Sequence, residues 1–233
     1  MLLLFILSAT MYLTTSATLA TPSFAPGEVV PERFITTDNL NDFFTCTEIP
    51  DDIFNLMQGR SFKANCVVPR SELRYIRVLH KNAHGESVVG EMTLHQSIAT
   101  EVLSILKELY QASYPIERMR LIDYYEADDE QSMRANNSSG FNFRYISHTT
   151  KVSVHGHGKA VDINPLYNPY HKVLKDGREV IEPANGAAYL KRDKVFPYKI
   201  TKEDLCCRLF KKHGFVWGGD WVNSKDYQHF EKP

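Results

Sequence analysis

The chain has 233 residues, of which 43% are hydrophobic and 24% are charged, and its formal net charge at pH 7 is −1. This composition is that of a globular protein, long enough for one well-packed domain and short for two. A net charge near zero supplies no overall positive field, so we expect no nucleic-acid partner.

The N-terminal twenty residues contain no charged side chain. An apolar run from Leu2 to Leu7 is followed by Thr and Ser and by small residues at Ala17 and Ala20, a pattern typical of a secretory signal peptide. The run is too short for stable membrane insertion, although the lack of a preceding Lys or Arg leaves a retained anchor as the alternative. We therefore predict a secreted or periplasmic protein divided into a signal peptide, an extended N-terminal segment and one folded domain: 1–20, 21–44 and 45–233.

Four cysteines follow, and they can be joined in three ways. In an exported protein Cys46 and Cys66 can pair across a short loop, which would stabilise the fold by about 3 kcal/mol. Neighbouring cysteines bridge only in a strained ring, so we expect Cys206 and Cys207 to stay reduced. No C-x-x-C spacing occurs, which argues against a structural zinc held by cysteines.

The middle of the chain carries alternating and helical patterns. Leu73 to Leu79 and Val88 to Leu94 suit two strands joined by a turn at 84–86, which predicts a hairpin. Apolar residues then recur at helical spacing between His95 and Tyr110, indicating a helix with one buried stripe.

Further along, Arg120 to Tyr125 resembles a strand, and Asp128 to Gly140 resembles a polar loop. Thr201 can cap a helix that begins at Lys202, and Gly214 is a suitable terminator. Strands and helices mix without regular alternation, so we predict an α+β fold built on an antiparallel sheet with packed helices.

The segment Ser153 to Pro165 reads SVHGHGKAVDINP. Alternation over its second half places Asp162 on the strand face opposite Val161. His155 lies an odd number of residues earlier, so on one continuous strand the two side chains would point to opposite faces. Glycines 156 and 158 can supply the turn that brings His155 back beside Asp162.

Near the C-terminus, Asp226 and His229 are three residues apart, which again requires a turn or bulge if both are to face one point. Catalytic zinc takes three ligands of the His and carboxylate type and leaves a fourth position for water. A further carboxylate must accept the proton of that water without binding the metal. His155, Asp162 and His229 as ligands, with Asp226 as base, fill these roles.

These residues carry a family resemblance. The pattern S-x-H-x-x-G-x-A-x-D, from Ser153 to Asp162, followed by D-x-x-H-F, from Asp226 to Phe230, resembles the D-alanyl-D-alanine carboxypeptidase and L-alanyl-D-glutamate peptidase family of zinc peptidases. Similarity extends to three flanking segments: Asp128 to Arg144, Ile163 to Tyr170 and Trp217 to Trp221. The resemblance implies the α+β fold that these peptidases share with the hedgehog signalling domain.

The resemblance also implies residue roles. One zinc ion per chain is bound by His155, Asp162 and His229, Asp226 is the general base, and Arg144 stabilises the developing oxyanion. His157 stands where relatives often carry an aromatic residue, and it is the alternative ligand to His155. Ser153 and Trp221 are expected to line the substrate site: Ser153 by hydrogen bonding, because no base that would make it a nucleophile is evident, and Trp221 as a pocket wall.

The implied substrate is the stem peptide of peptidoglycan, cleaved at either the L-Ala–D-Glu or the D-Ala–D-Ala bond. Trp217 to Trp221 and the polar loop, whose Asn136 and Asn137 begin N-x-S sequons, favour an endopeptidase. No H-E-x-x-H motif and no Walker motif occur. The rival hypotheses are a zinc-retaining module that binds cell wall or protein without turnover, and a hydrolase of non-peptide amides. The oligomeric state is not predicted.

Overall fold

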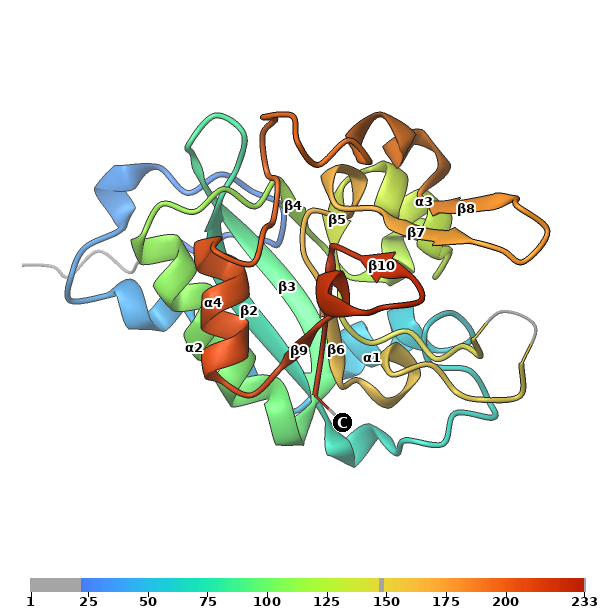
Figure 1. Ribbon diagram of the computed structural model, residues 1–233. Coiled ribbons are helices and arrows are strands. Elements are labelled where there is room, and N and C mark those ends of the chain that lie inside the picture. Colours follow the sequence, from blue (N-terminus) through green and yellow to red (C-terminus); the bar gives the residue numbers. More distant parts are fainter. Residues whose placement is uncertain (1–21, 147–148, 233) are drawn as a thin grey trace, which may run out of the picture.

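The computed structural model describes residues 22–146 and 149–232, so the predicted signal peptide at 1–20 lies outside the described residues (Figure 1). Helices and strands mix along the chain, and most strands pair antiparallel. The α+β class predicted from the sequence is confirmed. Within 22–146 and 149–232, no helix combines the length and the apolar character needed to cross a membrane.

The largest strands form a hairpin at the centre of the molecule. Strand β2 (Leu73–Lys81) pairs antiparallel with β3 (Ser87–His95) along its whole length, and β1 (Thr45–Thr47) extends the sheet on the other side of β2. The predicted hairpin is confirmed. Gly85 in its turn has a φ of 74°, a conformation that glycine adopts without steric cost.

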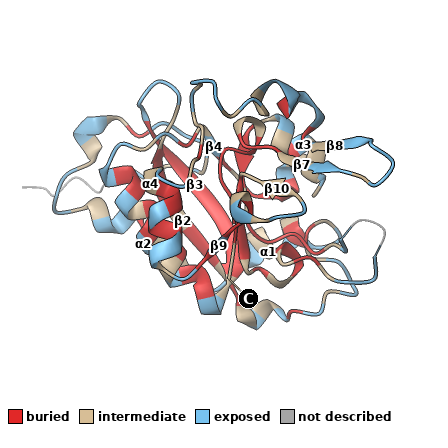
Figure 2. Cartoon of the chain, viewed as in Figure 1, coloured by how far each residue is buried: buried red, intermediate tan, exposed pale blue. Residues whose placement is uncertain are grey.

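Helix α2 (Gln96–Gln111) follows β3 directly and packs against this sheet, and α4 (Leu205–Lys212) packs beside α2 (Figure 1). The predicted helix after His95 is confirmed. Its apolar stripe is buried together with the inner face of the hairpin, as the red segments of Figure 2 show. The buried residues of α2 are Ile98, Ala99, Val102, Ile105, Leu106, Leu109 and Tyr110.

The second half of the chain supplies two small sheets beside the hairpin. The first has the order β6–β11–β9, with bounds Ala160–Asp162, His229–Glu231 and Val216–Trp217. The second has the order β10–β7–β8, with bounds Lys225–Asp226, Tyr170–Val173 and Glu179–Glu182. Both sheets have antiparallel neighbours throughout.

A second, smaller apolar cluster lies beneath α1 (Asp51–Met57). It contains Met57 together with Phe141 and Phe143, which are almost fully buried. Burying two phenylalanine side chains contributes about 3–6 kcal/mol. The segment that carries them is therefore held firmly against the body of the protein.

The segment 21–44, predicted to be extended, is partly helical where it is described. It contains two 3₁₀ turns, at Glu32–Phe34 and Leu40–Phe43. Its backbone also bonds to β3, because the N–H of Gly27 donates to the carbonyl of Val89 at 2.7 Å. Val30 is buried in the main core. This segment is thus packed onto the main core.

Three local predictions were wrong. Instead of a strand over Arg120 to Tyr125, the chain forms a short strand β4 (Arg118–Met119) and a 3₁₀ helix at Ile122–Tyr125. The expected loop from Asp128 to Gly140 contains α3 (Asp129–Arg134) and β5 (Asn137–Ser138), which pairs parallel with β4. A polar helix of six residues has no apolar stripe to reveal it.

The third error concerns the start of α4. Asp204, not Thr201, caps this helix by accepting a hydrogen bond from the N–H of Cys206 at 2.9 Å. The predicted terminator Gly214 does follow its end, with a φ of 80°.

All four cysteines have free thiols. The suggested bridge between Cys46 and Cys66 is therefore absent, and the two lie in different surroundings: Cys46 packs against the main core and Cys66 against the smaller cluster. Cys206 and Cys207 are buried and reduced, as expected.

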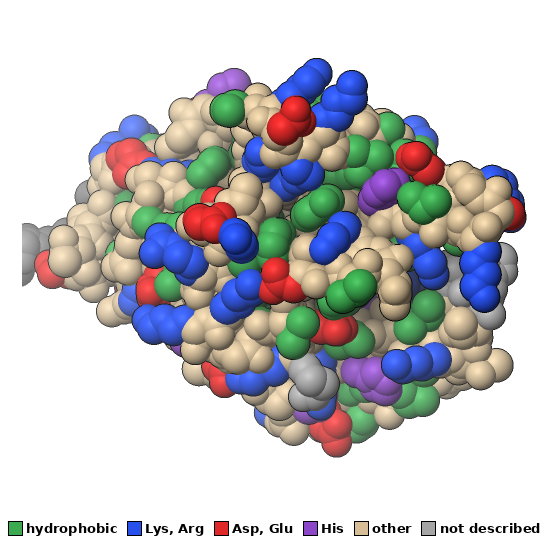
Figure 3. All heavy atoms as spheres, in the orientation of Figure 1, with side chains coloured by type: hydrophobic (Ala, Val, Ile, Leu, Met, Phe, Trp, Pro, Cys, Tyr) green, Lys and Arg blue, Asp and Glu red, His purple; other side chains and the backbone are tan. Residues whose placement is uncertain are grey.

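Lysine, arginine, aspartate and glutamate side chains are interspersed over the face shown in Figure 3. The distribution agrees with the near-zero net charge of the chain.

Candidate metal centre

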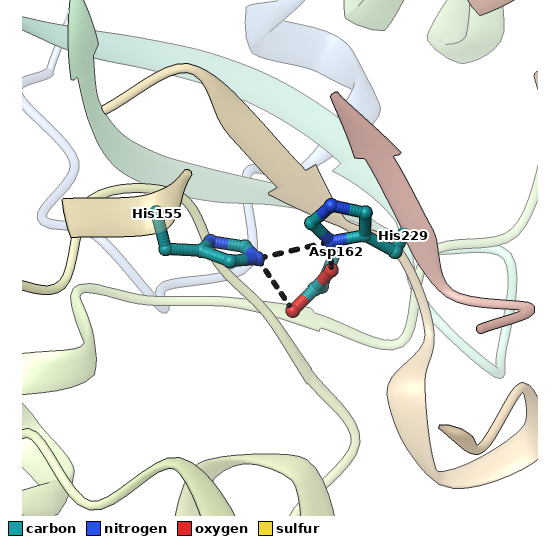
Figure 4. A group of neighbouring side chains, drawn as sticks. All are labelled: His155, Asp162 and His229. Carbon is teal, nitrogen blue, oxygen red and sulfur yellow. Dashed lines mark hydrogen bonds and ion pairs between the residues drawn. The ribbon is translucent and has the colours of Figure 1, made fainter. Parts of the chain in front are cut away.

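The three predicted ligands come from three elements that meet at one point (Figure 4). Asp162 ends β6 and His229 begins β11, and these two residues are direct partners in the antiparallel register. His155 comes from a 3₁₀ turn, His155–His157, that precedes β6. The sheet register thus places Asp162 beside His229, and the turn adds His155.

The glycine turn works largely as the sequence predicts. Gly158 has a φ of 67°, and this left-handed conformation reverses the chain between His155 and Asp162. Gly156 matters for a different reason: a side chain there would meet Val152 at 2.6 Å and the backbone oxygen of Arg144 at 3.2 Å. One glycine therefore makes the turn, and the other allows it to pack.

Hydrogen bonds determine which nitrogen of each histidine faces the site. Nδ1 of His155 donates to the carbonyl of Gly140 at 2.7 Å, and Nε2 of His229 faces the Glu231 carboxylate at 3.3 Å. The remaining nitrogens, His155 Nε2 and His229 Nδ1, lie 3.1 Å apart. Each also faces one oxygen of Asp162, at 3.1 Å and 2.9 Å respectively. In their neutral forms, both histidines therefore direct lone pairs at the same point as the carboxylate.

This donor set fits a zinc ion. A tetrahedral zinc with bonds of about 2.0–2.2 Å holds neighbouring ligand atoms about 3.3–3.6 Å apart. The two nitrogens are 3.1 Å apart, and each lies within 3.1 Å of a different oxygen of Asp162, so a small outward movement of these groups accommodates the ion. Binding of the second ring nitrogen to a carbonyl or a carboxylate is also the usual arrangement around histidine ligands.

The electrostatics of the cluster favour a bound cation. Burial alone would raise the pKa of Asp162, yet the hydrogen bonds and charges of His155 and His229 hold it well below its usual range. Burial likewise opposes protonation of His229, but its contacts with Asp162 and Glu231 raise its pKa to about 10. The site thus attracts positive charge strongly even though it is buried.

Asp226 lies next to this cluster, at the end of β10. Burial raises its pKa to about 8, and the negative charges of Asp162 and Glu182 act in the same direction, against His229. Within the described part of the chain, its buried Oδ1 has no hydrogen-bond partner. A buried carboxyl group with a raised pKa and an unpaired oxygen is chemically able to exchange a proton near neutral pH.

The other predicted site residues lie around the ligands. Arg144 forms an ion pair with Asp129, and its carbonyl accepts a hydrogen bond from the N–H of Ser153 at 2.9 Å. Ser153 is buried two residues before His155. The ring of Trp221 packs against His229 with their centroids 5.4 Å apart. Trp217 belongs to the core.

Two predicted features lie outside the ligand set. His157 is half-buried and does not join the group formed by His155, Asp162 and His229. Asn136 and Asn137 are buried rather than lining an open loop: Asn136 donates to Glu117 at 2.8 Å and Asn137 to the carbonyl of Arg120 at 3.0 Å. The buried positions of Asn136 and Asn137 therefore no longer favour an endopeptidase over a carboxypeptidase.

Glu231 is a residue that sequence reasoning missed. It follows His229 by two positions on β11, and residues two apart on a strand share a face. The spacing in the tripeptide His-Phe-Glu was therefore enough to predict that Glu231 lies beside His229 and orients its ring.

Comparisons with known proteins agree with this geometry. Residues 147–232, which include all three candidate ligands and Asp226, match the model of the family described as D-alanyl-D-alanine carboxypeptidase. The resemblance drawn from the motifs is confirmed, and the match supports a peptidase. No curated protein matches the chain. No solved structure matches it either.

Proposed function

We propose that this protein is a secreted zinc peptidase that hydrolyses one bond in the stem peptides of peptidoglycan. The observation that carries the proposal is the convergence of His155 Nε2, His229 Nδ1 and the Asp162 carboxylate, within 3.1 Å of one another. Beside them lies Asp226, whose buried Oδ1 has no hydrogen-bond partner among residues 22–146 and 149–232. The family match over residues 147–232 supports stem peptides of peptidoglycan as the substrate class.

The surroundings of each side chain support a distinct role for it. His155, Asp162 and His229 would hold one zinc ion, which when bound acts as a Lewis acid and lowers the pKa of water towards about 7. Asp226 takes up the proton of the attacking water and returns it to the departing amine. The positive charge of Arg144 balances the negative charge that develops on the substrate oxygen.

The raised pKa of Asp226 is consistent with its role as base. A carboxylate accepts a proton most effectively when its pKa lies near the working pH. A cation at the neighbouring ligand site favours the ionised form of Asp226 and so moves its pKa down from about 8. Asp226 would then be ionised, and ready to accept a proton, at neutral pH.

The decisive experiment replaces the base without changing its shape. Asp226→Asn should lower the rate of hydrolysis by about 10²–10⁴-fold while zinc stays bound, because the base contacts water and not the metal. The substrates are muropeptide fragments of defined stereochemistry, and mass spectrometry of the products identifies the cleaved bond. Asp220→Asn is the matched control, since Asp220 is an acid on the adjacent turn that pairs with Lys211.

The alternative is a module that keeps zinc but binds cell wall or protein without turnover. If zinc-loaded wild-type protein cleaves no wall-derived peptide, the peptidase proposal fails. Equal binding of such fragments by the wild type and Asp226→Asn would then favour the binding module. N-terminal sequencing of the exported protein tests secretion, and we propose a mature terminus near Thr21.

A further inference from the structure

The segment Gly140–Arg144 runs alongside the turn that carries His155. Its contacts with that turn occur at alternate residues: the Gly140 carbonyl accepts from His155 Nδ1 at 2.7 Å, and the Asn142 N–H donates to the His155 carbonyl at 3.1 Å. The Arg144 carbonyl then accepts from the N–H of Ser153 at 2.9 Å. The backbone of this segment is thus tied directly to a candidate metal ligand.

The same alternation separates the side chains of the segment into two sets. Phe141 and Phe143 are buried in the apolar cluster under α1. In an extended chain, neighbouring side chains point to opposite faces, so Asn142 and Arg144 lie on the face away from that cluster. Two buried rings therefore determine the direction in which the chain presents Arg144.

On that face, one carboxylate meets both side chains. Asp129, the first residue of α3, accepts a hydrogen bond from Asn142 Nδ2 at 3.0 Å on Oδ1. Its Oδ2 forms an ion pair with Nε of Arg144, a buried nitrogen that makes no hydrogen bond within the described residues. The side chains of Arg144 and Asp129 are 35% and 30% exposed, so this ion pair is partly shielded from solvent. Pairing through Nε leaves the two terminal nitrogens of the guanidinium for another partner.

Glu182 connects this ion pair to the candidate base. Burial raises the pKa of Glu182, and the positive charge of Arg144 acts against this rise. The negative charge of Glu182 in turn contributes to the raised pKa of Asp226. The strand register agrees, because Glu182 pairs with Tyr170 and Tyr170 pairs with Asp226. Arg144 thus belongs to the same side of the molecule as the proposed reaction site.

We propose that Asp129 is a positioning residue for Arg144, with Asn142 as its support: the carboxylate holds Nε so that the free end of the guanidinium is presented to the substrate. The expected effect of Asp129 on catalysis rests on the proposed function, whereas the ion pair itself does not. It assigns to α3, a helix that the sequence pattern does not reveal, the task of orienting a side chain fifteen positions further along.

The test is a double-mutant cycle on the zinc-loaded protein. Asp129→Asn keeps an oxygen for Asn142 but loses the charge that holds Arg144. It should lower kcat about 10- to 100-fold, as expected when a charge-stabilising group is misplaced, with zinc content and KM close to wild type. In an Arg144→Ala background, the same substitution should lower kcat no further. Glu130→Gln is the matched control, because the neighbouring carboxylate pairs with Arg134 instead.

Additive losses in the double mutant, or a loss that follows zinc content, would overturn the inference while leaving the peptidase proposal standing. A second measurement does not depend on activity. The Nε–H NMR signal of Arg144, identified by its absence in Arg144→Lys, should change its chemical shift in Asp129→Asn but not in Glu130→Gln, because only the first substitution removes the charge beside Nε. An unchanged chemical shift in Asp129→Asn would refute the ion pair even if no peptide is cleaved.

Discussion

The two histidines of the His-Gly-His turn differ in what surrounds them. His155 is buried with Nδ1 bonded to Gly140, whereas His157 is half-buried and lies outside the ligand group. We expect His155→Ala to lose the bound zinc, because a three-ligand site with one ligand removed binds zinc far more weakly. His157→Ala should retain about one zinc per chain. Elemental analysis of the two purified variants, with circular dichroism to verify folding, measures this.

The reverse pattern, with full metal in His155→Ala and none in His157→Ala, would transfer the ligand role to His157. Residue identity alone left this choice open, since both histidines have the same chemistry. The structure distinguishes them by position, because His155 Nε2 faces His229 and Asp162 whereas His157 lies outside this group.

At the scale of elements, the turn before β6 depends on Gly158. Its φ of 67° is costly for any other residue, and a side chain there would also lie 2.7 Å from the backbone nitrogen of His95. Gly85, in the hairpin turn, has a φ of 74° and nothing within 4 Å of the same position. Substituting each of these two glycines therefore distinguishes the cost of a left-handed backbone, present at both positions, from the cost of a steric clash, present only at Gly158.

Gly85→Ala should lower the free energy of unfolding by about 1–2 kcal/mol, which is the conformational cost alone. Gly158→Ala should lower it by about 1–3 kcal/mol more, because backbone must move to admit the side chain. Zinc affinity should fall only in Gly158→Ala, since the displaced turn carries His155. Urea unfolding and zinc titration of both variants decide the matter. Equal losses of stability would show that the contact with His95 is unimportant.

At the scale of the whole molecule, His80 makes stability depend on pH. It is buried in β2, with Nδ1 2.6 Å from the carbonyl of Ile116. Burial lowers its pKa from 6.5 to about 4. Below pH 6.5 the unfolded chain binds a proton that the folded protein does not, so stability falls as the pH drops from 6.5 towards 4. The total loss is roughly 3 kcal/mol.

We therefore expect His80→Gln to lose less stability than the wild type between pH 7 and pH 4.5. Urea unfolding with the metal chelated measures the difference, and comparing the two proteins cancels the titration of the zinc ligands. His84→Gln, which changes an exposed histidine in the hairpin turn, is the control and should behave as the wild type. Parallel pH profiles for wild type and His80→Gln would contradict the assignment.

Much of the framework follows from local patterns in the sequence. The β2–β3 hairpin and α2 have apolar periodicities that are readable over nine to sixteen residues. The three candidate ligands and Asp226 were predicted from residue type, spacing and glycine placement together with the family resemblance, and the structure brings the ligands together. The hairpin, the helix and the two site motifs are accessible because each is encoded within a short stretch of chain.

Tertiary structure alone decided the rest. Helix α3 is polar and six residues long, so it has no periodic signal. The N-cap of α4 is Asp204 and not Thr201, a choice between two capping residues that the sequence left open to error. The partners of the site were equally hidden: Gly140 for His155 and Asp129 for Arg144 are fifteen residues distant in sequence in both cases. Such pairings depend on how separate elements dock, and docking is determined by long-range burial rather than by local sequence.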